Sequence, residues 1–150
     1  MADRLLIIED TRTMAELYAK YLSAEGRESD IVSTGKDGLA KVSENDYAAI
    51  ILDLNLPDMD GLTILRHIQM AHAAIPVVVV TAYGSVGSAA DAMKFGAFDF
   101  IMKPFPSARL NATIKVAIDY AKIKKELQDL KNNMFDNLKH LPHTPVTVLP

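Results

Sequence analysis

Three short runs of uninterrupted aliphatic residues constrain the fold of this chain more than any other feature. They are Leu5–Ile8, Ala48–Leu52 and Val77–Val80, and a polar residue follows each of them. Continuous rather than alternating apolarity is typical of strands buried on both faces, as in a parallel sheet covered by helices. Two weaker strands are expected at Glu28–Val32 and Asp99–Met102, each of which closely follows a glycine.

Helical patterns fill the gaps between these five predicted strands. Apolar residues recur at helical spacing within residues 14–22, 39–42, 62–68 and 89–95. A fifth helix is expected to begin near Ser107, a residue type that is favoured at the N-cap, and to carry its own apolar stripe. The alternation predicts an α/β fold, a doubly wound five-stranded parallel sheet with helices on both faces and an extended C-terminal helix.

Charge and composition exclude several classes of protein. The 150 residues include 16 basic and 19 acidic side chains, and a net charge of −3 argues against a protein that coats nucleic acid. The absence of cysteine excludes disulfides, thiolate metal sites and cysteine nucleophiles. No apolar run approaches the roughly 20 residues that cross a membrane, and the N-terminus lacks a signal-peptide layout. We therefore expect a cytoplasmic protein without direct nucleic-acid or membrane contact.

Polar residues follow four of the predicted strands. Glu9 and Asp10 come after the first strand, Asp53 after the third, Thr81 after the fourth and Lys103 after the fifth. In open α/β sheets, chemistry gathers beyond the carboxyl ends of the strands, so these side chains should meet at one edge. Three crowded carboxylates are costly without a cation, and an oxygen-only set suits Mg²⁺.

The same residues are suited to phosphoryl transfer. A metal ion and an ammonium group can neutralise the charge that develops on a transferred phosphoryl group, and a hydroxyl can hydrogen-bond one of its oxygens. Asp53 follows the central strand, so it is the natural nucleophile for an aspartyl phosphate.

From about Arg4 to about Lys122, the chain resembles the receiver domain of bacterial two-component response regulators. The matching motifs are Glu9-Asp10, Leu52–Pro57, Met59–Gly61, Val80–Ala82 and Lys103–Phe105. Two further stretches, Ala82–Ser85 and Gly96–Phe100, are most similar to receivers of enhancer-binding (NtrC-type) transcriptional regulators. The resemblance implies the flavodoxin-like (βα)5 fold, and it implies that the chain is a regulatory fragment of a transcriptional regulator or a stand-alone receiver.

The resemblance also implies a role for each matching residue. Asp53 would accept a phosphoryl group from a histidine kinase, while Thr81 and Lys103 would contact that group. Mg²⁺ would be held by Glu9, Asp10, Asp53 and the backbone carbonyl of Asn55. Switch positions would be Thr81, Phe100, where many relatives have tyrosine, and Tyr83, which would shield the acyl phosphate. The chain would be a signalling module rather than a turnover enzyme, apart from its own phosphorylation and slow dephosphorylation.

The fifth helix is expected to continue beyond the receiver. Apolar residues alternate at spacings of three and four, with Asn137 interrupting the seam; they are Tyr120, Ile123, Leu127, Leu130, Met134 and Leu141. This pattern favours a dimerising linker helix, so we expect a homodimer through that helix and the face of the fourth helix, fifth strand and fifth helix. The expected division is a receiver at 1–122, the extended helix at 123–141, and a flexible tail at 142–150, which contains three prolines.

Other interpretations stay open at this stage. The acidic pocket could belong to a pseudo-receiver that only dimerises, or the chain could be a single-domain phosphorelay intermediate. Asp58–Thr63 resembles the nucleophile motif of haloacid-dehalogenase-type phosphatases, but Pro57 places Asp58 in a loop rather than at a strand end. A flavin-binding protein is disfavoured because Glu9 and Asp10 would repel a phosphate. No glycine-rich ATP loop is found.

Overall fold

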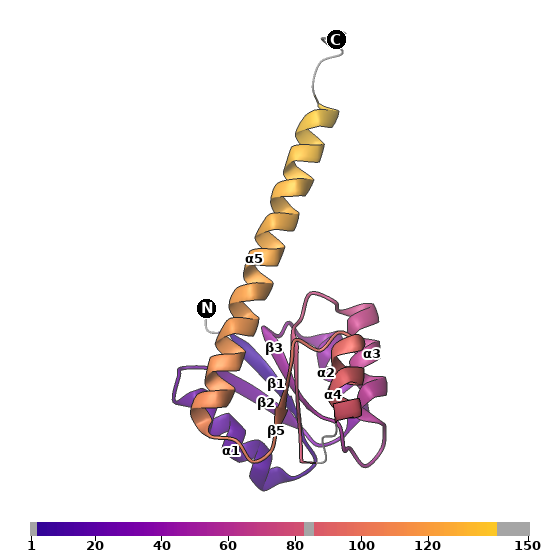
Figure 1. Cartoon of the computed structure of the whole chain (residues 1–150). Helices are drawn as coiled ribbons and strands as arrows, with labels where there is room; N and C mark the ends of the chain where they lie inside the picture. The colour runs from indigo at the N-terminus through magenta and orange to yellow at the C-terminus, as the bar shows by residue number, and fades with distance from the viewer. Residues whose placement is uncertain (1–2, 83–85, 141–150) are drawn as a thin grey trace.

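The computed structural model describes residues 3–82 and 86–140, in which strands and helices alternate (Figure 1). The strands are β1 (Arg4–Ile8), β2 (Glu28–Val32), β3 (Ala49–Asp53), β4 (Val77–Thr81) and β5 (Asp99–Met102). The helices are α1 (Arg12–Ser23), α2 (Gly35–Glu44), α3 (Gly61–Ala71), α4 (Val86–Lys94) and α5 (Ser107–Lys139). The predicted α/β fold with an extended C-terminal helix is confirmed.

The five strands form one sheet in the order β2-β1-β3-β4-β5, and every neighbouring pair is parallel. Successive side chains of a strand point to opposite faces, so the continuous apolar runs supply two separate cores. Leu5 and Ile7 face the core beneath α1 and α5, whereas Leu6 and Ile8 face the core beneath α2, α3 and α4. Figure 1 shows these two helix layers on either side of the sheet.

Strand and helix boundaries differ from the predictions at a few positions. β3 and β4 each continue one residue further than predicted, so Asp53 and Thr81 are the last residues of their strands. Ser107 was expected near the N-cap of α5, but it is the first helical residue, and Pro106 occupies the N-cap position without a side-chain hydrogen bond. The expected capping role is wrong because Pro106 already has the extended backbone of an N-cap, with φ −76° and ψ 158°.

A close backbone approach shapes the loop between β3 and α3. The amide of Gly61 donates to the carbonyl of Leu54 at 3.1 Å, and any Cβ at position 61 would collide with the Leu54 backbone. Glycine is therefore required at this position. The contact folds the segment after Asp53 back on itself, which holds Asn55 beside the carboxyl edge of the sheet.

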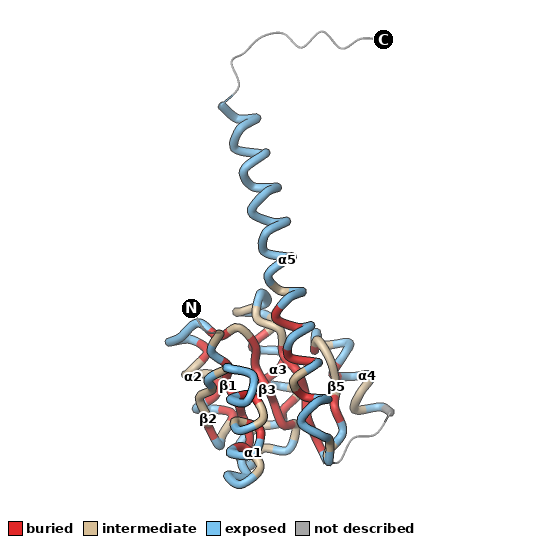
Figure 2. The backbone as a smooth tube through the Cα atoms, turned by 90° about the vertical axis from the view of Figure 1, so that its left-hand side faces the viewer, coloured by how far each residue is buried: buried red, intermediate tan, exposed pale blue. Residues whose placement is uncertain are grey.

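Helix α5 changes its environment abruptly along its length. Its first part is buried through Leu110, Ile114, Ala117 and Ile118, and the rest projects from the body with an exposed surface (Figure 2). The exposed part carries many large apolar side chains: Tyr120, Ile123, Leu127, Leu130, Met134, Phe135 and Leu138. The predicted seam residue Leu141 and the predicted tail at 142–150 lie outside the described residues.

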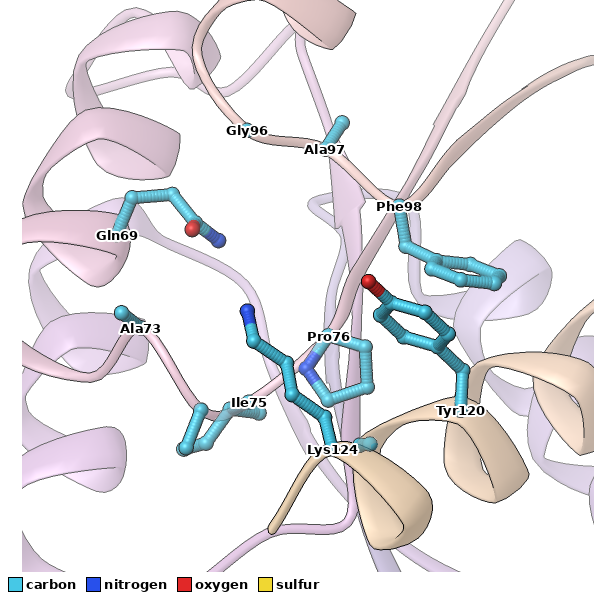
Figure 3. A pocket seen from close by; sticks show the side chains of 11 residues that line it. Gln69, Ala73, Ile75, Pro76, Gly96, Ala97, Phe98, Tyr120 and Lys124 are labelled. Carbon is cyan, nitrogen blue, oxygen red and sulfur yellow. The ribbon is translucent and has the colours of Figure 1, made fainter. Parts of the chain in front are cut away.

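A hollow of about 400 Å³ lies where α5 leaves the body, near the amino end of β4 (Figure 3). Ile75, Pro76 and Phe98 give it apolar walls, and the side chains of Tyr120 and Lys124 point into it. The rings of Phe98, which directly precedes β5, and Tyr120 of α5 pack with centroids 5.6 Å apart, at the point where α5 begins to project from the body. Among residues 3–82 and 86–140, we find no helix with the length and apolarity to span a membrane.

Candidate functional site

The carboxyl edge of the sheet brings the predicted polar residues together. Hydrogen bonds extend the ladder beyond the strands, because the Glu9 amide donates to the Val32 carbonyl and the Lys103 amide donates to the Thr81 carbonyl, each at 3.0 Å. Parallel strands in register therefore carry Glu9, Asp53, Thr81 and Lys103 to one place. The expectation drawn from strand ends is confirmed for these four residues.

Lys103 is the centre of a buried ion cluster. Its Nζ donates to Glu9 Oε1 at 2.7 Å and to Asp53 Oδ2 at 2.8 Å. Glu9 is 1% exposed and Asp53 is 4% exposed, so neither carboxylate is screened well by water. When both carboxyls are ionised, one ammonium shared between them leaves the cluster with excess negative charge, which favours the binding of a cation.

Burial and hydrogen bonding shift the pKa values of Glu9 and Asp53 in opposite directions. Burial, reinforced by hydrogen bonding with Asp53, raises the pKa of Glu9 to about 8. Burial also opposes ionisation of Asp53, but hydrogen bonding with Glu9 and Lys103 outweighs it and lowers the pKa of Asp53. The same two partners raise the pKa of Lys103 against the effect of its own burial. Asp53 is thus kept ionised, as a nucleophilic carboxylate must be.

Glu9, Asp10 and Asp53 fit a hard divalent cation. One ligand oxygen from each residue can be chosen so that all three lie within 4.8 Å of one another. Glu9 Oε2 is buried without a hydrogen-bond partner among the described residues, so it has an unused lone pair at the site. Carboxylate oxygens with access to solvent suit Mg²⁺, which binds through few protein ligands and keeps several waters.

An open hollow of about 520 Å³ gives access to the cluster. Its lining includes Asp10, Asp53, Asn55 and Lys103. Asp10 itself is exposed, whereas Asp53 is buried and lines this opening. A small anion or the side chain of a partner protein can therefore approach Asp53 from one direction.

Asn55 makes two hydrogen bonds that its sequence position did not indicate. Its amide donates to Asp53 Oδ1 at 2.9 Å, and its side-chain Nδ2 donates to Thr81 Oγ1 at 3.1 Å. The resemblance assigned only the backbone carbonyl of Asn55, as a metal ligand. The side chain in fact joins the loop after β3 to the end of β4, so the predicted switch residue Thr81 is held next to Asp53.

Of the two aromatic residues predicted at switch positions, the structure describes only Phe100. Phe100 lies on β5, is partly buried and packs against the core beneath α2, α3 and α4. Tyr83 lies outside the described residues.

Asp58 and Asp60 have local structural partners. Asp58 accepts hydrogen bonds from the backbone amides of Gly35 and Lys36 at 2.8 and 3.0 Å, at the amino end of α2. Asp60 caps α3 by accepting from the Leu62 amide at 3.2 Å. Because Asp58 lies in a loop and is used in this way, the structure supports the argument against a phosphatase nucleophile at this position.

One aromatic residue beside the cluster, Tyr18, was not singled out from the sequence as a site residue. The Tyr18 ring stacks on Phe105 with centroids 5.2 Å apart, and Lys103 Nζ lies 5.9 Å from the centre of the Tyr18 ring. Tyr18 was interpreted only as part of the apolar stripe of the first helix. Helical periodicity carries no signal that this tyrosine, unlike its neighbours, faces a lysine 85 positions later in the chain.

Comparisons with a family model and with curated proteins point to the same family. The family model described as response regulator receiver domain matches residues 5–115. Over 130 residues the chain is 37% identical to the luminescence regulatory protein LuxO of Vibrio campbellii, covering 86% of this chain and 29% of the relative. Over 146 residues it is 32% identical to a putative NtrX-like response regulator of Rickettsia typhi, covering 96% of this chain and 31% of the relative.

Solved structures agree with the same fold. The signal receiver domain of a putative LuxO repressor protein from Vibrio parahaemolyticus superposes with a TM-score of 0.81 and 33% identity, covering 85% of this chain and 98% of that one. NtrX from Brucella abortus, in complex with ADP, superposes with a TM-score of 0.82 and 33% identity, over 87% of this chain and 30% of that one. The chain thus spans less than a third of the length of these LuxO and NtrX-like regulators.

Proposed function

The chain belongs to the response regulator receiver family, and we propose that Asp53 is its phosphoacceptor. The observation that carries the proposal is the environment of the Asp53 carboxylate, which is buried, bonded to Lys103 and part of the lining of an open hollow. Such a carboxylate is a nucleophile with an ammonium group already beside it.

The reaction transfers one phosphoryl group to an Asp53 oxygen. With a histidine-kinase phosphohistidine as donor, the new oxygen–phosphorus bond forms as the nitrogen–phosphorus bond breaks, and the histidine keeps the bonding electron pair. Lys103 Nζ bonds Asp53, and the Thr81 hydroxyl is linked to the same site through Asn55, which supports the proposal that both would contact the phosphoryl oxygens. Positioning and charge neutralisation supply most of the acceleration in reactions of this kind.

Mg²⁺ is the proposed cofactor. Glu9, Asp10, Asp53 and the backbone carbonyl of Asn55 would hold the ion, which would neutralise charge on the phosphoryl oxygens. The unpartnered Glu9 Oε2 and the closeness of the three carboxylates support this assignment.

Phosphorylation would act as a switch. A phosphoryl group adds negative charge and strong acceptor oxygens, so Thr81 would exchange its bond from Asn55 for one to the new group. Movement at the end of β4 would repack Phe100 and α4. Tyr83 is proposed to shield the acyl phosphate, as the family resemblance implies.

The output is proposed to be a change in self-association. The face of α4, β5 and α5 and the exposed seam of α5 would form a homodimer, and the apolar side chains beyond Ile118 support this because they are left uncovered in one chain. We propose residues 1–122 as the receiver, 123–141 as the dimerising helix and 142–150 as a linker or tail. In this view the chain is the regulatory part of a cytoplasmic transcriptional regulator and does not itself contact nucleic acid.

Intact mass after incubation with acetyl phosphate tests the chemistry. We expect one added phosphoryl group that depends on Mg²⁺ and is lost in Asp53→Ala. Asp58→Asn is the matched control, since it removes a nearby loop carboxylate and should still be modified. Absence of modification, together with absence of beryllofluoride binding, would favour a pseudo-receiver instead.

Light scattering on the same samples tests the output. A change of oligomer on phosphorylation would support a switch that acts through α5. A constant dimer would make α5 a permanent linker, whereas a monomer in both states would favour a phosphorelay intermediate.

A further inference from the structure

Buried polar atoms without partners are concentrated around Lys103. In the described residues, three buried side-chain atoms lack a hydrogen bond, and they are Glu9 Oε2, the Tyr18 hydroxyl and Asn111 Oδ1. Two of the three belong to residues in contact with Lys103. An unsatisfied buried group is costly, so each one in a folded protein calls for a physical explanation.

The Glu9 oxygen is explained by the proposed cation, but the Tyr18 hydroxyl is not. Tyr18 is 1% exposed and lies on the buried face of α1. A phenylalanine would fill this apolar position without a polar atom to satisfy. Burial raises the pKa of the hydroxyl to about 12, so the group remains protonated and neutral at physiological pH.

Lys103 has a hydrogen available for this hydroxyl. An ammonium group has three donors, and two of them are directed to Glu9 Oε1 and Asp53 Oδ2. The Tyr18 hydroxyl lies near enough for the ammonium to oppose, in part, the rise in its pKa that burial causes. Tyr18 is also fixed in place, because its ring stacks on Phe105, two residues beyond the lysine.

We propose that Tyr18 is a positioning residue for Lys103, whose ring backs the ammonium and whose hydroxyl accepts its third hydrogen when the site is phosphorylated. This inference rests on the proposed function. Once Asp53 is esterified, the lysine must turn from the carboxylates toward phosphoryl oxygens. A fixed acceptor behind the ammonium holds it at the reacting edge and leaves the other two hydrogens directed forward.

Tyr18→Phe tests the role of the hydroxyl, and Tyr21→Phe is the matched control. Tyr21 lies on the same helix and packs partly buried against the same core, but it does not contact Lys103. We expect Tyr18→Phe to phosphorylate about tenfold more slowly at saturating acetyl phosphate and Mg²⁺, with the half-saturating donor concentration unchanged. Tyr21→Phe should match the wild type.

Thermal stability separates positioning from structure. Removing a buried hydroxyl that has no partner should leave the melting temperature of Tyr18→Phe unchanged or higher. A slower reaction in a protein of equal or greater stability would support the proposal. A slower reaction that accompanies a lowered melting temperature would show a structural role and overturn it.

The ammonium signal of Lys103 provides a readout that does not require phosphorylation. In the beryllofluoride-bound protein with isotope-labelled lysine, we expect faster hydrogen exchange at Lys103 in Tyr18→Phe than in the wild type. The signal is assigned by its loss in Lys103→Arg. If beryllofluoride binds but the wild type accepts no phosphoryl group from acetyl phosphate, the proposed function fails, and this signal still tests the inference. Equal exchange rates in Tyr18→Phe and the wild type overturn the role of Tyr18.

Discussion

Two clusters at opposite ends of the sheet each combine one basic side chain with two acidic ones, but they differ in burial. At the amino end Arg4 binds Glu28 and Asp30, and at the carboxyl end Lys103 binds Glu9 and Asp53. Each cluster is one cation shared by two carboxylates from other strands or strand ends. The first is largely exposed, with 46% of the Arg4 side chain accessible, whereas only 12% of the Lys103 side chain is accessible.

The difference shows that burial, rather than charge type, makes a cluster reactive. Water screens the Arg4 cluster, and its carboxylates need no further cation. At Lys103 the low dielectric strengthens every interaction, so an added cation or phosphoryl group has a large effect. The amino-end cluster joins β1 to β2, where Tyr47 also donates to Asp30 at 2.7 Å, and we assign it a structural role.

The largest expected difference between the two clusters is the loss of stability when the basic side chain of each is replaced. Lys103→Met leaves two buried carboxylates without their counter-charge, and we expect the free energy of unfolding to fall by about 3 kcal/mol. Arg4→Met should change it little, because its partners remain solvated. Urea unfolding of both variants measures the difference, and similar losses for the two variants would contradict the comparison.

Addition of Mg²⁺ should stabilise only the buried cluster. At a concentration tenfold above its dissociation constant, the ion should stabilise the wild type by about 1.4 kcal/mol, since binding to the folded state alone adds to stability. Asp10→Asn removes a proposed ligand and should abolish most of this response, which thermal unfolding with and without Mg²⁺ detects. Asp30→Asn serves as the control and should keep the full response.

The smallest expected effect is the pH dependence of the exposed cluster. The hydrogen bond from Arg4 lowers the pKa of Asp30 below its ordinary value. A lowered pKa stabilises the folded state above the unfolded pKa, and this contribution is lost as the pH falls through the folded pKa. Wild type should therefore exceed Asp30→Asn in stability by about a few tenths of a kcal/mol at pH 7, and the difference should vanish in acid once the pH falls below the lowered pKa of Asp30.

Chemical unfolding of both proteins across that range measures the effect. A difference of several kcal/mol at pH 7 would mean that the amino-end cluster behaves as a buried one.

The sequence predicted most of the site because the site depends on strand ends. Apolar runs locate buried strands, and in a parallel sheet all the strands end at the same edge, so Glu9, Asp53, Thr81 and Lys103 could be grouped without coordinates. Short-range patterns such as helical spacing also located the helices, including the long α5. Strand and helix patterns depend on residues that are close together in the chain, so a single sequence is enough to show them.

Side-chain contacts between distant segments were decided only by the tertiary structure. Three of these contacts join separate segments of the chain. They are the hydrogen bond from Asn55 to Thr81, the ion pair of Lys103 with Glu9, and the approach of Tyr18 to Lys103. The start of α5 at Ser107 depended on the backbone of Pro106, which propensity alone did not resolve. Periodicity shows which face of an element is buried, but the partner of a buried atom depends on how helices and strands pack in three dimensions.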